Sequence, residues 1–176
     1  MNKRDLSVSM QSANSTALYI GIPVVVFQFT IFSGLHSGKS MQTTGSFLVF
    51  LAFVLAGVVV HELIHGLTWM AFGGKPLSTI KFGFQWKTFT PYAHLSEPID
   101  VNAYRIGAIM PGVILGIIPY ILSLILGDGN LLWFSMIHLT AASGDWLVLW
   151  LLRKIKRGTL VEDHPTQAGC YVYETS

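Results

Sequence analysis

The sequence predicts an all-α integral membrane protein with about four transmembrane helices and a short β-hairpin-like segment between the second and the third. Composition and patterning support this fold class. Hydrophobic residues make up 52% of the 176-residue chain and charged residues only 11%, whereas a soluble domain is about 25% charged. The mean hydropathy is +0.55, and the apolar residues gather in four long runs. A chain with so little polar surface is expected to lie in a lipid bilayer.

The four apolar runs have lengths suited to membrane-spanning helices. They cover residues 17–32, 47–72, 106–126 and 131–152. About 20 apolar residues cross the hydrocarbon core as a helix, and the last three runs reach that length. The first run is shorter and contains Pro23, so it could also be the hydrophobic part of a signal peptide. No clear small-x-small cleavage site follows it, which favours an uncleaved first span.

The segments outside the apolar runs are more polar. Residues 1–16 are expected to form a flexible or interfacial lead-in, and residues 33–45 a short external loop. Residues 128–130 (Asp-Gly-Asn) predict a tight turn that makes the third and fourth spans antiparallel. Residues 153–176 are expected to be a soluble tail, whose basic first part lies near anionic headgroups. The whole chain, residues 1–176, is predicted to be a single domain.

The connection between the second and third runs shows the alternation of a β-strand. Its apolar residues recur at every second position, which is the pattern of a strand with one apolar face. These positions are Ile80, Phe82, Phe84 and Trp86. Residues 91–95 could pair back on this strand as a cytoplasmic hairpin. Such a hairpin either lies on the membrane surface or presents an edge to which an extended peptide adds through backbone hydrogen bonds.

The basic residues predict how the chain is oriented. With four spans and both termini on one side, every Lys and Arg except Lys39 falls on the side of the termini. Short cytoplasmic loops carry the excess of Lys and Arg. We therefore predict a multi-pass protein of the cell membrane with both termini in the cytoplasm. The formal net charge is only +2, which argues against nucleic acid as a main partner.

The second apolar run carries the residues that indicate chemistry. His61-Glu62-Leu63-Ile64-His65 is a His-Glu-x-x-His motif in an otherwise apolar segment. Residues four apart lie on one face of a helix, so the two imidazoles can bind one Zn²⁺ while the Glu serves as a general base. In a soluble helix the same pattern can be a solvated polar face. Within a membrane an ionisable group costs about 2.5–3.5 kcal/mol, which favours metal binding.

A catalytic zinc usually has three protein ligands and one water, so a third ligand is required. Within the spans, the remaining acidic residue is Asp145 and the remaining histidine is His138. His61 lies roughly 22 Å along its span from Ser46 at 1.5 Å per residue. Asp145 lies roughly 21 Å along its own span from Leu131 by the same rise. Both spans run inward, so the two side chains lie at matching depth, and Asp145 is the predicted third ligand.

Two further histidines have more than one possible role. His138 lies about 10 Å from Asp145 along the helix, so the two cannot readily ligate one ion. It either hydrogen-bonds a metal ligand or makes a polar contact between spans. His94 could approach the site from the hairpin, although a surface histidine is the default. A donor for a tetrahedral oxyanion could come from His138, Ser143, Asn102 or His94.

Three segments carry a resemblance to a known family. They read VHELIHG, YRIGAIMPG and AASGDWLVLWLLRKIKRGTLVEDHP. They resemble a family of small bacterial membrane proteins described as putative zincin peptidases, over most of residues 50–173. That family is loosely similar to the site-2 intramembrane metalloproteases, in which an Asp on a later span completes a zinc site reached from the cytosol.

The resemblance implies roles for four residues. It makes His61, His65 and Asp145 zinc ligands, and it makes Glu62 the catalytic base. The surroundings of Asp145 read Ser-Gly-Asp-Trp, which departs from the Asp-Gly motif of the site-2 proteases. The implied source is a bacterial cell membrane.

The residues and the resemblance together predict a membrane-embedded zinc metallopeptidase. It would hydrolyse peptide bonds of membrane-associated or transmembrane substrates at a site open to the cytosol, with Zn²⁺ as cofactor. The expected partners are the substrate and the bilayer. Residues 161–165 (Val-Glu-Asp-His-Pro) could contact the mouth of the site.

Two other classes of protein are compatible with the sequence. A non-catalytic metal-binding scaffold, or pseudoprotease, would keep the fold without needing Glu62, so the retained Glu62 favours the enzyme. A small transporter would use Glu62, Asp145 and His138 as a relay of polar groups and would bind no zinc tightly.

Overall fold

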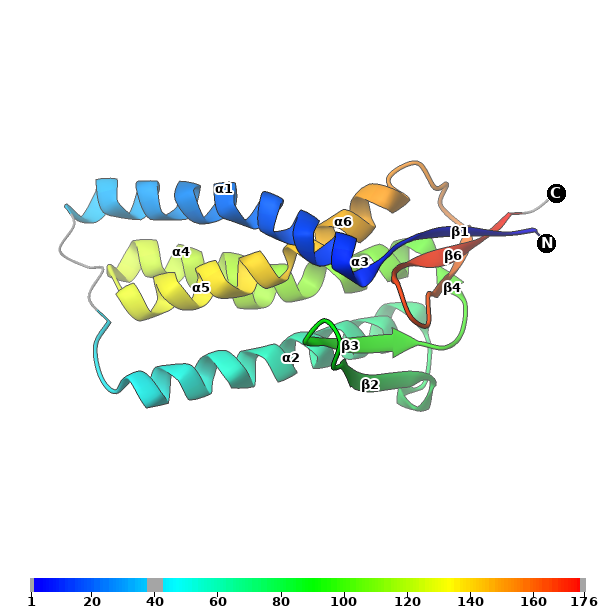
Figure 1. Ribbon diagram of the computed structural model, residues 1–176, viewed down its shortest axis with the longest axis horizontal. Helices are drawn as coiled ribbons and strands as arrows, with labels where there is room; N and C mark the ends of the chain where they lie inside the picture. Colours follow the sequence, from blue (N-terminus) through cyan, green and yellow to red (C-terminus); the bar gives the residue numbers. More distant parts are fainter. Residues whose placement is uncertain (1, 38–42, 175–176) are drawn as a thin grey trace.

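The strands of the molecule lie at one end of its helical bundle. The computed structural model describes residues 2–37 and 43–174. Within them, the helices form a bundle, and six strands gather at the end of the bundle where both termini lie (Figure 1). The all-α prediction is therefore wrong in part. The helical bundle and the hairpin are present as predicted, but a four-stranded sheet accompanies them.

Four helical stretches of the described chain are long and apolar enough to cross a membrane. The first two are single helices, α1 (Met10–His36) and α2 (Phe47–Gly73). The third combines α3 (Val101–Pro111), a π-helical turn η2 (Gly112–Ile117) and α4 (Ile118–Leu126). The fourth combines α5 (Gly129–Ala141) and α6 (Ser143–Leu152). These stretches agree with the four predicted runs.

The first helix is longer than its apolar run. Ser9 caps it, because its side chain accepts a hydrogen bond from the Ser12 N–H, as serine commonly does at a helix N-terminus. The predicted flexible lead-in is therefore partly helical. At its other end α1 continues to His36, so the start of the predicted loop is also helical. Residues 38–42 of that loop lie outside the described residues.

The termini form one antiparallel sheet. Its strand order is β1 (Asn2–Val8), β6 (Ala168–Glu174), β5 (Leu160–Asp163) and β4 (Ile99–Asp100). Segments that the sequence analysis assigned to a flexible lead-in and a soluble tail are thus paired strands. Strands β1 and β6 are separated by the whole helical bundle along the chain, and pairing over such a distance leaves no local turn signal. That is why the sheet was not predicted.

A buried core joins this sheet to the helices. It contains Trp69 of α2, Leu152 of α6 and Val161 of β5, all less than 5% exposed. Arg105 of α3 reinforces the junction, because its guanidinium donates to the carbonyls of Leu152 and Ile155 at 2.6 and 2.7 Å. Leu152 is the last residue of α6 and Ile155 follows it, and carbonyls at a helix C-terminus need donors from outside the helix. The sheet and the helical bundle therefore position each other.

The predicted hairpin is confirmed. After a short 3₁₀ helix, η1 (Leu77–Thr79), strand β2 (Ile80–Gln85) pairs antiparallel with β3 (Thr90–Leu95). The hairpin packs on α2, where the Phe82 ring occupies the space beside Gly66. On its other side, the Asn14 side chain of α1 donates to the carbonyl of Thr88 and the hydroxyl of Thr90. The hairpin is thus held between α1 and α2.

The third and fourth stretches pack closely at two glycines. A Cβ at Gly112 would lie 3.2 Å from that of Ala142, and one at Gly116 would lie 2.4 Å from Leu139. Small residues let helix backbones approach in this way. The contact lies beside Ala142, the residue that separates α5 from α6.

The single cysteine of the chain reports on closure of the sheet. Burial, with Asp163 and Asp5 nearby, raises the pKa of the Cys170 thiol to about 12. Because the thiolate is the nucleophile, we expect iodoacetamide at pH 8 to modify Cys170 at least about 100-fold more slowly in the folded protein than after denaturation. Mass spectrometry over time measures this ratio. Equal rates in both states would contradict the paired β1–β6 sheet.

Candidate metal centre

The three side chains predicted to bind metal converge. His61 and His65 come from α2 and Asp145 from α6, and one ligand-type atom of each lies within 4.8 Å of the others. The two Nε2 atoms are 3.2 Å apart. The Asp145 carboxylate lies 3.1 Å from the Nε2 of His61 and 3.3 Å from that of His65. The structure therefore brings together the three residues that the depth argument paired.

Helix geometry explains how each side chain reaches this point. His61 and His65 are one turn apart on one face of α2, and they are only 7% and 6% exposed. Asp145 lies in the first turn of α6, directly after the break at Ala142. A helix N-terminus carries partial positive charge, so this position favours a carboxylate. The Ser-Gly-Asp-Trp surroundings thus place Asp145 at the start of a new helix.

The donor set fits a zinc ion. Two imidazole nitrogens and a carboxylate are common zinc ligands, with bonds of about 2.0–2.2 Å in tetrahedral sites. Ligand atoms on such a tetrahedron lie about 3.3 Å apart, which the 3.2 Å between the two imidazole nitrogens matches. Each of these nitrogens lies 3.1 or 3.3 Å from a different oxygen of Asp145. In addition, the buried Nδ1 of His61 has no hydrogen-bond partner among the described residues. A metal bound at the Nε2 atoms would also separate the Asp145 carboxylate and the two imidazoles that crowd together here.

The orientation of the His65 ring is fixed by a hydrogen bond at Nδ1, the nitrogen that does not face the metal centre. Its Nδ1 lies 2.9 Å from the carbonyl oxygen of Gly107 on α3. A carbonyl can only accept, so Nδ1 carries a proton and Nε2 is the ring nitrogen on the side of Asp145. Metal-binding histidines usually donate their second nitrogen in this way. The His65 ring also stacks on Trp69, which stacks in turn on Tyr104.

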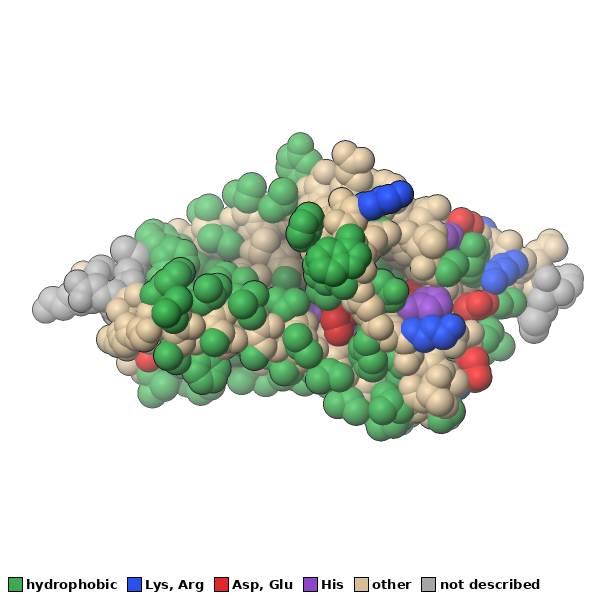
Figure 2. Space-filling view, turned by 60° about the horizontal axis from the view of Figure 1, so that its bottom comes forward, with side chains coloured by type: hydrophobic (Ala, Val, Ile, Leu, Met, Phe, Trp, Pro, Cys, Tyr) green, Lys and Arg blue, Asp and Glu red, His purple; other side chains and the backbone are tan. Residues whose placement is uncertain are grey.

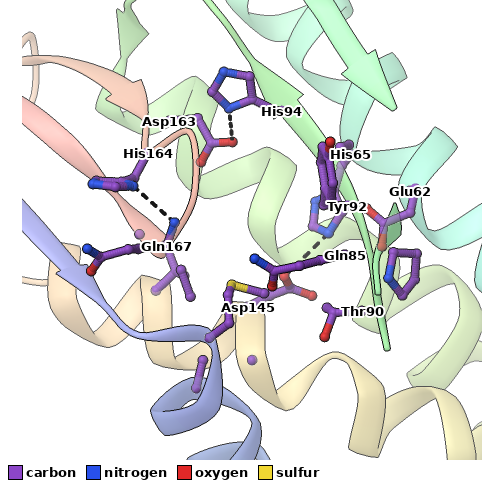
Figure 3. A pocket seen from close by; sticks show the side chains of 18 of the residues that line it. Glu62, His65, Gln85, Thr90, Tyr92, His94, Asp145, Asp163, His164 and Gln167 are labelled. Carbon is purple, nitrogen blue, oxygen red and sulfur yellow. Dashed lines mark hydrogen bonds and ion pairs between the residues drawn. The ribbon is translucent and has the colours of Figure 1, made fainter. Parts of the chain in front are cut away.

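The fourth predicted residue lies beside the donor set. Glu62 lines the same pocket as His65 and Asp145, and Figure 3 shows the three side chains directed toward one another. Its carboxylate faces the backbone N–H of Ala93 on β3. Glu62 is not among the three grouped ligand atoms, so it remains available to accept a proton.

The pocket itself is built from distant parts of the chain. Its volume is about 420 Å³, and α1, α2, the hairpin, α6 and the β5–β6 turn all line it. Asp163, His164 and Pro165 belong to this lining, so the expectation that residues 161–165 contact the mouth is confirmed in part. Figure 3 shows Asp163 and His164 across the pocket from Glu62.

A polar cluster at the pocket was missed by the sequence analysis. Asp163 accepts a hydrogen bond from the Tyr104 hydroxyl at 2.6 Å and lies 3.1 Å from Nδ1 of His94. His94 is therefore paired in the pocket, and the default of an isolated surface histidine is wrong. The only sequence signal for this role was that Asp163 belongs to Val-Glu-Asp-His-Pro, the segment expected at the mouth of the site. The cluster needs β5 beside α3, a contact that no local pattern indicates.

The other oxyanion candidates do not line the pocket. The Ser143 hydroxyl donates to the Leu139 carbonyl, and the Asn102 side chain accepts from Arg105. His138 is 1% exposed and packs in the bundle interior. None of the three appears among the described residues that line the pocket, whereas His94 does.

A His-Glu-x-x-His helix with a carboxylate brought from a second helix is the donor arrangement of a zinc metallopeptidase. The model of a family described as "Putative zincin peptidase" matches residues 54–160. The match covers more than half of the chain, which therefore belongs to this family. Membership indicates a metallopeptidase, and the word zincin implies zinc. Searches among curated proteins and solved structures found no match.

The support behind His65 can be tested by one substitution. A Cβ at Gly107 would lie 2.0 Å from Nε1 of Trp69, so Gly107→Ala must displace the indole that stacks on His65. We expect a loss of about 1–3 kcal/mol in the free energy of unfolding, as overpacking causes. Denaturant unfolding in detergent measures it. Gly144→Ala is the control, because nothing lies within 4 Å of its Cβ; equal stability of the two variants would contradict this packing.

Proposed function

We propose that this protein is a membrane-embedded zinc metallopeptidase that cleaves membrane-associated or transmembrane substrates at a site open to the cytosol. The observation that carries the proposal is the convergence of His61, His65 and Asp145 beside Glu62 and a pocket. Two of these donors are buried in a helix whose other residues are mostly apolar. Ionisable groups are costly inside a membrane, so the few that occur there usually serve a function.

In this proposal, His61, His65 and Asp145 hold Zn²⁺ and Glu62 is the catalytic base. Bound zinc supplies a Lewis acid that activates water and polarises a carbonyl group. Glu62 accepts a proton from the attacking water as the new C–O bond forms. It then delivers that proton to the amine that leaves when the C–N bond breaks. The products are one carboxylate and one amine, so a single water is consumed.

The outer edge of β3 offers a place for the substrate. The N–H of Ala93 faces Glu62, so it points away from β2. In an antiparallel pair both backbone groups of a residue face the same side, so the Ala93 carbonyl also lies on this edge. Strand β3 belongs to a two-stranded sheet, and its outer edge can therefore accept an extended peptide. An extended segment exposes the carbonyls that a helix would keep bonded.

His94 is the proposed donor for the oxyanion. It is the one candidate from the sequence that lines the pocket. Nδ1 of His94 lies 3.1 Å from the Asp163 carboxylate. The other ring nitrogen, Nε2, is therefore the one proposed to donate to the oxyanion. A donor preorganised in this way costs no reorientation during the reaction.

The proposed membrane orientation places both termini in the cytoplasm. Figure 2 shows apolar side chains covering the helical part of one face, while basic and acidic side chains gather toward the strand end. The large exposed apolar residues of α1, α2 and α4 include Phe27, Phe53 and Ile125, each at least 62% exposed. Such a surface suits lipid, and the basic strand end suits the cytoplasmic side.

Reporter fusions test this orientation. Alkaline phosphatase, which is active only outside the cytoplasm, should be inactive at the C-terminus and after Gly74, but active after Asp128 between α4 and α5. A fluorescent protein that folds in the cytoplasm should give the opposite pattern. Activity of the phosphatase at the C-terminus would overturn the orientation.

The catalytic proposal predicts that two substitutions affect zinc binding and peptide cleavage differently. Purified protein should contain one zinc per chain, measured by plasma mass spectrometry. Asp145→Ala should lose most of it, because only two ligands remain. Glu62→Gln should keep the zinc but lower cleavage of labelled casein in detergent at least about 100-fold, as expected for removal of a general base.

The outcomes separate the candidate functions. Wild type without zinc would contradict the metallopeptidase proposal and favour the transporter. Zinc in both proteins, with no difference in casein cleavage between wild type and Glu62→Gln, would favour the non-catalytic scaffold. Gln11→Asn, a change of similar kind at an exposed residue of α1 that does not line the pocket, is the control for handling and should cleave within about threefold of wild type.

A further inference from the structure

Three imidazole nitrogens near the metal centre lack partners. They are Nδ1 of His61 and both ring nitrogens of His138, and none has a hydrogen-bond partner among the described residues. His138 is 1% exposed and His61 is 7% exposed. Buried polar groups in folded proteins are usually hydrogen-bonded, either to protein or to ordered water. Three unpaired nitrogens in one region therefore require an explanation.

His138 reaches α2 one turn from the metal centre. A Cβ on Gly57 would lie 2.3 Å from its Nε2, so the ring fills the place that a side chain at position 57 would take. Gly57 and His61 are four residues apart on α2 and share one face of that helix. The Phe134 ring, 4.3 Å away between centroids, holds the imidazole from its own helix α5. The position of His138 is thus fixed on both sides.

The two metal-facing histidines of α2 differ in their support. His65 donates its Nδ1 proton to the Gly107 carbonyl, as metal-binding histidines usually do. His61 has no equivalent acceptor, although its Nε2 faces Asp145 at 3.1 Å. One helical turn is about 5.4 Å, and a single water with two ordinary hydrogen bonds spans about the same distance. His138 is therefore placed to supply the missing acceptor through one water.

We propose that His138 is a positioning residue that holds His61 through one buried water. The Nδ1–H of His61 donates a hydrogen bond to this water, and the water donates one to a single ring nitrogen of His138, so two of the three unpaired nitrogens gain a partner. This contact keeps Nε2 of His61 directed at the metal centre. The inference rests on the proposed function, because it assumes that zinc binds there. Gly57 is required because any side chain would displace the His138 ring.

Zinc affinity, measured without relying on activity, tests the role of His138. The full chain carrying Glu62→Gln is purified in detergent, and its zinc dissociation constant is measured by competition with a chromophoric chelator. His138→Leu, which keeps the volume but removes both nitrogens, should weaken zinc binding by about 10–100-fold. His138→Gln, which retains a polar acceptor, should remain within about threefold of the parent. His36→Leu, a change of the same kind on α1 where the ring bonds the Leu124 carbonyl, should leave zinc affinity unchanged.

A second variant guards against a general packing defect. Gly57→Ala should displace the His138 ring and weaken zinc binding at least about tenfold, while His138 itself is retained. Gly34→Ala is its control, since nothing lies within 4 Å of that Cβ. Thermal unfolding of each metal-free variant identifies any that fail to fold, and the comparison then uses the folded ones.

The results distinguish this inference from the proposed function. No zinc in the parent protein would overturn both. Zinc in the parent, with unchanged affinity in His138→Leu, would overturn the role of His138 and leave the metallopeptidase standing. Equal weakening by His138→Leu and His138→Gln would also overturn it, because volume rather than hydrogen bonding would then be responsible.

Discussion

The meeting of two imidazoles and a carboxylate inside an apolar bundle is the constraint on which the rest of the structure depends. His61, His65 and Asp145 cannot be solvated by apolar neighbours, so they must satisfy one another or an ion. Their ligand-type atoms lie within 4.8 Å, which requires the start of α6 to lie within side-chain reach of α2. After the break at Ala142 a new helix, α6, begins, and its first turn carries Asp145. The partial positive charge at the N-terminus of α6 stabilises the negatively charged carboxylate.

A continuous set of contacts links this centre to the sheet at the strand end of the bundle. His65 stacks on Trp69, Trp69 stacks on Tyr104, and the Tyr104 hydroxyl donates to Asp163 at the end of β5. Asp163 in turn holds His94 of the hairpin. The sheet formed by the chain termini therefore does more than close the bundle. Because β5 positions Asp163, the pairing of β5 with β4 and β6 also shapes the pocket.

The β2–β3 hairpin lines the pocket and contacts both α1 and α2. Its β3 strand faces Glu62 through the Ala93 N–H, while Asn14 of α1 bonds Thr88 and Thr90 near its turn. Alternation within residues 80–86 gives the strand two faces, of which one packs Phe82 against Gly66 of α2. Backbone donors, rather than further charged side chains, thus lie at the edge of the metal centre. In an apolar setting this limits the number of ionisable groups that must be buried.

The sequence by itself determined the helical stretches, the hairpin and the identity of the convergent side chains. Apolar length and period-two alternation are local properties, and rise per residue is constant in a helix, so even the matching depth of His61 and Asp145 could be predicted. Only the tertiary structure decided the terminal sheet, the pairing of His94 with Asp163, and the contact of His138 with Gly57. Each of these joins segments that are remote along the chain, and a remote contact depends on how helices pack rather than on the residues next to it. The donor set could thus be predicted from sequence, whereas the groups that orient it could not.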